Sequence, residues 1–156
     1  GHQHAQKFFQ LAAELVQRRN WRAIFLTKDP SQLPANLPAS ILWQAYAPLS
    51  ELLPKVALLA HHGGIGTSAE AMRAGVPQLV TPYAWDQFDN AGRMQELGVA
   101  RSIAAKKLTL SKLESAIVCL LQDEQVKHAS QRLASHFAQS IPVATMCEQL
   151  VQALGS

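Results

Sequence analysis

Short apolar runs alternate with helix-like segments along most of the chain, and this alternation limits the fold more than any other feature of the sequence. The runs have the length of strands and are apolar on both faces, at residues 23–26, 41–43, 56–60, 78–81 and 99–103. Strands with two buried faces are typical of parallel sheets that helices cover on both sides. The alternation therefore predicts an α/β fold with a doubly wound parallel sheet, whose ligands lie at the carboxyl ends of the strands.

The segments before, between and after these runs have apolar residues at helical spacing. This spacing predicts a tail that is wholly helical from Ser111 onward, and individual helices over residues 3–19, 67–74, 86–97, 124–139 and 143–154. Gly75 and Gly98 stand where two of these helices are expected to end. The segment from Ser111 to Glu114 has the form of a capping box, which predicts that the tail helix begins there.

The composition narrows the class of protein. A chain of 156 residues fits one domain, and 48% hydrophobic against 16% charged residues can supply a core, which excludes a disordered chain. The net charge of +3 is compatible with a small anionic ligand but is too small to indicate binding of nucleic acid. No apolar run reaches the roughly 18 residues that a membrane span needs. Cys119 and Cys147 lack metal-ligand spacing, so we expect buried thiols in a reducing, cytoplasmic compartment.

The most informative segment runs from His61 to Glu70, where a buried strand leads through a turn with three glycines into a helix. Glycines let backbone N–H groups approach a ligand without an intervening Cβ atom. The unpaired N–H groups and the dipole at a helix start favour an anion, and His62, Thr67 and Ser68 add side-chain donors. The segment therefore predicts a diphosphate site, although it has neither the Walker A lysine nor the Gly-x-Gly-x-x-Gly spacing.

Structural roles compete with functional ones for several residues. Thr67 to Glu70 also fits a capping box, and Asp86 could be the N-cap of the helix that follows it. His61 follows a buried strand and could be a hydrogen-bonded core residue. The two adjacent histidines point to opposite sides of an extended chain, and no third ligand has supporting spacing, so no metal site is predicted.

A longer pattern surrounds the glycine-rich turn. In order it contains Tyr46-Ala47-Pro48, Leu52-Leu53-Pro54, His61-His62-Gly63-Gly64, Gly66-Thr67, Glu70, Ala74-Gly75-Val76-Pro77-Gln78, Pro82 and Asp86-Gln87. This pattern resembles the donor-binding signature of nucleotide-sugar-dependent glycosyltransferases with the two-domain GT-B fold. The resemblance is to the UDP-glycosyltransferase superfamily in its bacterial His-His-Gly-Gly form, and it implies the Rossmann-like C-terminal half of such an enzyme with a helical tail.

The resemblance implies a donor-binding role for ten residues. The resemblance implies that Glu70 binds the ribose hydroxyls and that Asp86 and Gln87 bind the sugar hydroxyls. The backbone of Ala47 would contact the edge of the base. The residues that would contact the phosphates are His62, Gly64, Gly66, Thr67 and Ser68. Plant relatives place a tryptophan near the position of Tyr46, and an aromatic ring there can stack on the base. We expect Tyr46 to be the stacking residue and Trp43, which lies inside a predicted strand, to belong to the core. The helix start and His62 would make a metal unnecessary.

The implied activity is hexose transfer from a nucleoside-diphosphate sugar to a hydroxyl acceptor by an inverting glycosyltransferase. Glu70 favours a UDP-sugar, with a dTDP-sugar as the other candidate. The general base of relatives lies in an N-terminal acceptor domain, so no catalytic residue is expected here. The alternative is a non-catalytic nucleotide-sugar-binding subunit that needs a separate acceptor-binding partner chain. Relatives also carry a strand before the first helix, so we expect residues 1–156 to be a single donor-binding domain that lacks this strand and the acceptor domain.

Overall fold

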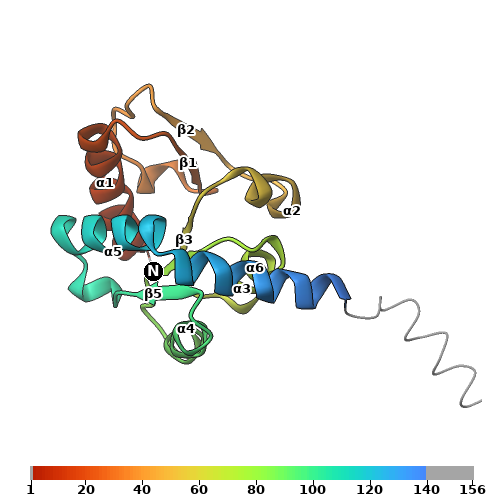
Figure 1. Ribbon diagram of the computed structural model, residues 1–156. Coiled ribbons are helices and arrows are strands. Elements are labelled where there is room, and N and C mark those ends of the chain that lie inside the picture. Colours follow the sequence, from red (N-terminus) through yellow and green to blue (C-terminus); the bar gives the residue numbers. More distant parts are fainter. Residues whose placement is uncertain (1, 140–156) are drawn as a thin grey trace, which may run out of the picture.

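The computed structural model describes residues 2–139, in which strands and helices alternate as the sequence predicts (Figure 1). The strands are β1 (Ala23–Leu26), β2 (Ile41–Gln44), β3 (Leu59–His61), β4 (Gln78–Val80) and β5 (Ala100–Ser102). The helices are α1 (His2–Arg19), α2 (Leu49–Leu52), α3 (Ile65–Ala74), α4 (Asp86–Glu96), α5 (Leu110–Gln122) and α6 (Glu124–Gln139). Short 3-10 turns lie at Pro30–Gln32, Leu53–Lys55 and Ala105–Lys107.

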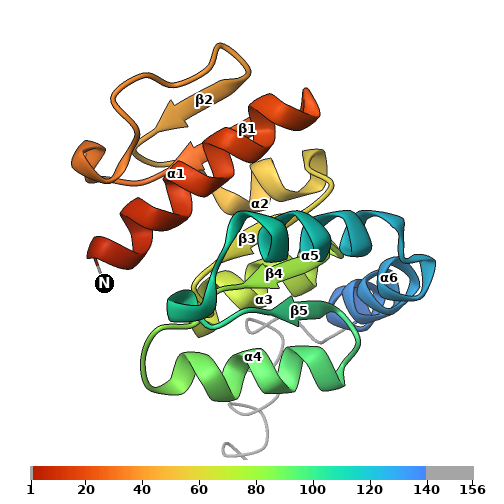
Figure 2. The same ribbon diagram turned by 90° about the vertical axis from the view of Figure 1, so that its left-hand side faces the viewer.

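All strand pairs are parallel, but the strands form two sheets rather than one. β1 pairs with β2 from Ala23 opposite Ile41, and β4 lies between β3 and β5. Figure 2 shows β1 and β2 in one part of the molecule and β3, β4 and β5 in the other, with α1 and α5 on the side that faces the viewer. The predicted α/β class with parallel strands is confirmed.

One hydrophobic core joins the two sheets. It contains Leu15 of α1, Phe25 of β1, Leu79 of β4, and Leu113 and Leu120 of α5, all buried. Leu79 lies in the middle of β4, whose three residues are buried, as expected for a strand with a neighbour on each side and helices over it. Helix α5 is therefore an integral part of the core and not a surface appendage.

Two helix starts differ from the sequence prediction. Helix α3 begins at Ile65 with Gly64 as its N-cap, so the capping-box interpretation of Thr67 to Glu70 is wrong. Helix α5 begins at Leu110, and the Thr109 hydroxyl accepts a hydrogen bond from the Lys112 N–H at 3.3 Å, so the capping box predicted at residues 111–114 is wrong as well. In both cases the chain turns into the helix earlier than the polar pattern indicated.

Two burial predictions also need correction. Trp43 is 40% exposed rather than part of the core, because β2 pairs only with β1 among the described strands, and its indole N–H donates to the Thr27 carbonyl at 3.1 Å. Cys119 is a free thiol that is half-buried rather than buried. The predicted helix over 143–154, with Cys147, lies outside the described residues. No helix among residues 2–139 has the length and apolarity to cross a bilayer.

Candidate functional site

His61, at the end of β3, holds the glycine-rich turn in place. Its Nδ1 atom accepts a hydrogen bond from the Gly63 N–H at 3.1 Å, and its Nε2 atom lies 2.9 Å from Oε1 of the buried Gln78. Because Nδ1 accepts, the proton is on Nε2, which donates to Gln78. Burial lowers the pKa of His61 to about 4, an effect that the Gln78 hydrogen bond opposes and His62 reinforces. His61 is therefore a neutral, half-buried residue with hydrogen bonds from both ring nitrogens, which confirms that it has a structural role.

Close packing and backbone conformation require glycine at Gly63, whereas at Gly64 only the movable ring of exposed His62 lies close. Gly63 has a φ of +98°, and a Cβ atom there would lie 2.9 Å from Val80 Cγ1 and 3.1 Å from the Gln87 carbonyl oxygen. A Cβ atom at Gly64 would lie 2.9 Å from Nε2 of His62. The His62 ring thus folds over the backbone of Gly64, beside the start of α3.

The amino end of α3 is open to solvent and has no side-chain cap. Its N-cap is Gly64, and no side chain donates or accepts a capping hydrogen bond there. The first-turn N–H groups of Ile65, Gly66 and Thr67 have no partner within the helix. Gly66 is exposed, and a Cβ atom at this position would meet nothing within 4 Å. This end of α3 therefore offers three backbone donors and a partial positive charge to a ligand.

Ser68 does not contribute a donor to this surface. Its backbone N–H donates to the Gly64 carbonyl at 3.0 Å and its hydroxyl donates to the same oxygen at 2.9 Å. The residue is also only 1% exposed. In this structure both donors of Ser68 form hydrogen bonds inside the helix, and its contact with phosphate stays a prediction.

Four of the expected site residues line one large cavity of about 1310 Å³: Tyr46, Ala47, His62 and Thr67. Tyr46 is 72% exposed, so its ring is free to meet a planar group. The cavity reaches the carboxyl ends of β1, β3 and β4, where Thr27, His62 and Thr81 lie. The structure thus brings the aromatic candidate, the histidine and the start of α3 around one space, at the edge where parallel sheets bind ligands.

Glu70, Asp86 and Gln87 do not line this cavity. Glu70 lies on the same face of α3 as Thr67, one turn later, and its Oε1 atom forms an ion pair with Arg73 Nη1 at 2.8 Å. Asp86 is the first residue of α4, whose N-cap is Trp85, so the interpretation of Asp86 as an N-cap is wrong.

Gln87 fastens the loop between β4 and α4. Its Oε1 atom accepts hydrogen bonds from the backbone N–H groups of Tyr83 at 3.0 Å and Ala84 at 3.3 Å. The oxygen of the side chain therefore has a structural role. Its amide nitrogen has no part in these bonds and keeps its two donors.

Two residues at this edge were not singled out from the sequence. The Tyr83 ring lies between His4 of α1 and His62, with centroid distances of 5.9 Å and 6.1 Å. Asn90 Nδ2 donates to the Gly63 carbonyl at 3.0 Å and to Asp86 Oδ2 at 3.3 Å. The position of Tyr83 just after a buried strand, and the spacing of Asn90 one turn after Asp86, were the available signals.

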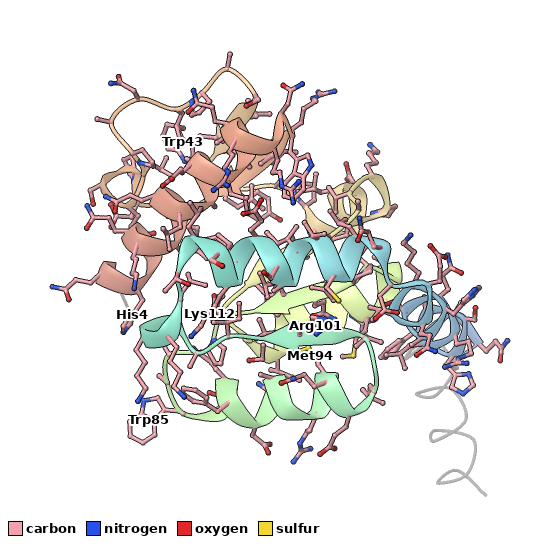
Figure 3. All side chains as sticks on the ribbon, turned by 60° about the vertical axis from the view of Figure 1, so that its left-hand side comes forward. His4, Trp43, Trp85, Met94, Arg101 and Lys112 are labelled. Atoms are coloured by element: carbon pink, nitrogen blue, oxygen red, sulfur yellow. The ribbon has the colours of Figure 1, made fainter. Side chains whose placement is uncertain are left out.

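Trp85 is the most exposed of the large hydrophobic side chains among the described residues. It is 91% exposed and has a φ of +45° and a ψ of −126°. Figure 3 shows its side chain projecting away from the fold, on the same side of the molecule as His4.

Within residues 2–139 no three His, Cys, Asp or Glu side chains are grouped as metal ligands. The site is thus built from backbone donors, a histidine, polar side chains and aromatic rings.

Comparison with known proteins identifies relatives of this chain. Residues 20–153 match the family described as erythromycin biosynthesis protein CIII-like, C-terminal domain. The chain is 30% identical over 139 residues to a sterol 3-beta-glucosyltransferase of Candida albicans, covering 89% of this chain and 9% of the relative. It is 31% identical over 129 residues to the aklavinone 7-beta-L-rhodosaminyltransferase of Streptomyces galilaeus, covering 83% of this chain and 29% of the relative.

A solved structure extends the comparison to three dimensions. The glycosyltransferase VinC in complex with dTDP superposes with a TM-score of 0.69 at 31% identity, over 76% of this chain and 30% of that chain. The chain thus spans less than a third of these proteins, and the family model that it matches describes a C-terminal domain. The chain belongs to the family of erythromycin biosynthesis protein CIII-like C-terminal domains and has the Rossmann-like fold of GT-B glycosyltransferases.

Proposed function

We propose that this chain is the donor-binding half of a glycosyltransferase and binds the diphosphate of a nucleotide sugar at the amino end of α3. The observation that carries the proposal is the uncapped start of α3, with exposed Gly66, beside the His62 ring and in reach of the large cavity. Backbone N–H groups and the positive end of the helix dipole together form an anion site. Within residues 2–139, no side chain or carbonyl group accepts a hydrogen bond from these backbone N–H groups.

The same groups suit the chemistry of sugar transfer. As the bond to the sugar breaks, negative charge develops on the departing nucleoside diphosphate, and fixed donors aimed at that charge lower the barrier. The three N–H groups of α3, with a hydrogen bond from His62, would supply this stabilisation without a metal ion. We therefore expect a chelator to leave nucleotide binding unchanged.

The positions of several other residues suggest how they would contact the base, the ribose and the sugar of the nucleotide sugar. Tyr46 presents an exposed ring for stacking on the base, and the backbone of Ala47 lines the same cavity. Glu70, one turn beyond Thr67, would accept hydrogen bonds from ribose hydroxyls. Gln87 would donate to sugar hydroxyls through its amide nitrogen, with Asp86 as the accepting partner.

We propose a UDP-sugar as the preferred donor, because Glu70 favours a ribose with both hydroxyls. The relative VinC, whose structure holds dTDP, makes a dTDP-sugar the alternative. We propose hexose transfer with inversion to an acceptor hydroxyl, with the general base outside this chain. The free thiol of Cys119 is consistent with a cytoplasmic location.

An acceptor-binding part is required, either as an N-terminal domain or as a separate partner chain. Exposed apolar side chains gather near the donor edge, on the first turns of α3 and α4 and the residue before α4: Ile65, Trp85 and Phe88. Exposed apolar patches beside a site are typical of interaction surfaces. If a separate chain fills this role, the present chain acts as a nucleotide-sugar-binding subunit. Sugar transfer that appears only when a candidate partner is added would identify that case.

The test compares thermal unfolding with UDP, dTDP, GDP and ADP. A ligand at a hundredfold excess over its dissociation constant stabilises the folded state by about 2.7 kcal/mol, and we expect this for UDP first. His62→Ala and Glu70→Ala should weaken UDP binding, whereas Glu96→Ala, an exposed residue at the far end of α4, should not. No stabilisation by any of the four nucleotides would overturn the proposal.

A further inference from the structure

Arg73, one turn after Glu70 on α3, holds one oxygen of the Glu70 carboxylate. Its Nη1 atom donates a hydrogen bond to Glu70 Oε1 at 2.8 Å, within an ion pair between neighbouring turns of the helix. Within residues 2–139, no side chain or backbone group donates to the other oxygen, Oε2. One oxygen is thus fixed by a cation, and the other keeps its lone pairs for a hydroxyl group.

The Arg73 side chain is in turn held by an aromatic ring from another helix. Its guanidinium carbon lies 5.7 Å from the centroid of the Phe137 ring, which is the distance of a cation–π contact. Phe137 belongs to α6 and is half-buried. An ion pair on a helix surface ordinarily costs the rotamer freedom of two long side chains and contributes little. The ring restricts the guanidinium beforehand, so the position of the Glu70 carboxylate depends on α6.

Close packing fixes α6 relative to α3. Gly75 ends α3 with a φ of +69°, and a Cβ atom there would lie 3.2 Å from Ala134 Cβ and 3.5 Å from the Ser130 carbonyl oxygen. Ala134 and Phe137 are three positions apart in α6 and therefore lie on the same face of that helix. The face of α6 that meets the end of α3 thus also brings Phe137 to Arg73.

We propose that Arg73, held by Phe137, is a positioning residue that orients the Glu70 carboxylate for the ribose hydroxyls, so that α6 contributes to the selection of ribonucleotide donors. This inference rests on the proposed function, in which Glu70 accepts hydrogen bonds from the ribose. A carboxylate that is already oriented loses less rotamer freedom when a ligand binds. The orientation therefore raises the affinity only for ligands that carry the hydroxyls.

The test compares UDP with its dideoxy form, which lacks both ribose hydroxyls, by calorimetric titration of the full chain. The ratio of the two dissociation constants reports on the hydroxyls alone, because the base and the diphosphate are the same. We expect the parent to bind UDP more tightly by about tenfold or more, since hydrogen bonds to a charged group are strong. In Glu70→Ala the two nucleotides should bind equally.

Arg73→Ala should lower the ratio by about threefold or more, because the carboxylate must then be ordered when the ribose binds. Any effect of the lost charge on the diphosphate is common to both nucleotides and cancels in the ratio. Phe137→Leu, which removes the ring but keeps an apolar side chain, should lower the ratio as well, whereas Phe137→Tyr keeps a ring and should retain it. The matched control is Arg93→Ala, which breaks an exposed ion pair with Asp89 on α4 and should leave the ratio unchanged.

A cycle with Glu70 tests whether Arg73 acts through that residue. Adding Arg73→Ala to Glu70→Ala should not change the ratio further, and a further change would overturn the positioning role. A parental ratio in Arg73→Ala would overturn the inference and leave the proposed function intact if Glu70→Ala still abolishes the preference. A parental ratio in Phe137→Leu alone would overturn the contribution of α6.

Two outcomes would reach beyond Arg73. Equal affinities of the parent for UDP and its dideoxy form would overturn the inference together with the assignment of the ribose to Glu70. Failure of the parent to bind either nucleotide would overturn both the inference and the proposed function.

Discussion

The Nδ1 atom of His61 accepts a hydrogen bond from the backbone N–H of Gly63 at 3.1 Å, so a side chain of β3 closes the turn that follows β3. The accepting role of Nδ1 places the proton on Nε2, toward Gln78. The two adjacent histidines therefore have different functions. His61 is a neutral residue whose two ring nitrogens are hydrogen-bonded inside the protein, whereas the His62 side chain is exposed.

This difference predicts a pH dependence of stability. The pKa of His61 is lowered by burial from 6.5 to about 4 in the folded protein. Between these values the unfolded chain binds the proton and the folded chain does not, so stability falls as the pH is lowered from 6.5 toward 4. The contribution of this residue is about 3 kcal/mol over that range. Urea unfolding between pH 4 and 7.5 would measure it.

The control for this prediction is His61→Asn, whose side-chain oxygen can still accept from the Gly63 N–H but does not titrate. This variant should be less stable than the parent at pH 7.5, because Gln78 loses a partner, and should show a flatter dependence on pH. An equally steep loss of stability in His61→Asn would mean that another group titrates.

Gly66 and Gly92 form a matched pair that separates stability from binding. Both lie in helices, and a Cβ atom at either position would meet nothing within 4 Å. Each Gly→Ala change should therefore raise the free energy of unfolding by up to about 1 kcal/mol. Only Gly66→Ala should weaken UDP binding, because its methyl group would stand on the open start of α3. Calorimetric titration of both variants would show this, and equal affinities would place the diphosphate elsewhere.

Gln87 allows its loop-holding and sugar-binding roles to be separated. Gln87→Ala removes the acceptor of two backbone N–H groups and should lower stability by about 1–3 kcal/mol. Gln87→Glu keeps an acceptor at the same place but loses the amide donors. It should retain most of the stability while binding the nucleotide sugar more weakly and the free nucleotide as before. Loss of both affinities together would assign Gln87 a structural role alone.

Trp85 has backbone angles that favour glycine. Its φ of +45° and ψ of −126° resemble the first central residue of a type II′ turn, a position where L residues are strained. Trp85→Gly should therefore raise stability by about 1 kcal/mol despite the larger entropy of an unfolded glycine. Trp85→Ala, which keeps the strain and removes the exposed ring, should not. A stabilised alanine variant would show that the exposed ring, rather than the backbone, limits stability.

Much of the fold was predictable because its signals are local. The five apolar runs, and the helices that became α1 and α6, carry their periodicity within a few residues. The division into two sheets was not predictable from these patterns, because strand pairing depends on which edges meet in space. The exposure of Trp43 could not be predicted for the same reason, since an apolar run does not show whether its strand lies at the edge of a sheet.

The site was predictable in position but not in detail. The glycine-rich turn marked the start of a helix, and His62 and Thr67 line the cavity there. The sequence could not show that the N–H and the hydroxyl of Ser68 both donate to the Gly64 carbonyl, because this depends on where the helix begins. It could not show that Asn90 reaches back to Gly63, since the contact joins residues 27 positions apart.

Helix α5 contributes Leu113 and Leu120 to the same core that holds Phe25 of β1 and Leu79 of β4. The Arg19 side chain at the end of α1 also pairs with Glu114 of α5 at 2.7 Å. A version of the protein shortened to before Leu110 would leave both sheets without a complete interior. Val126 of α6 belongs to the same core, so a truncation at the end of α5 would also remove a buried member of the shared interior.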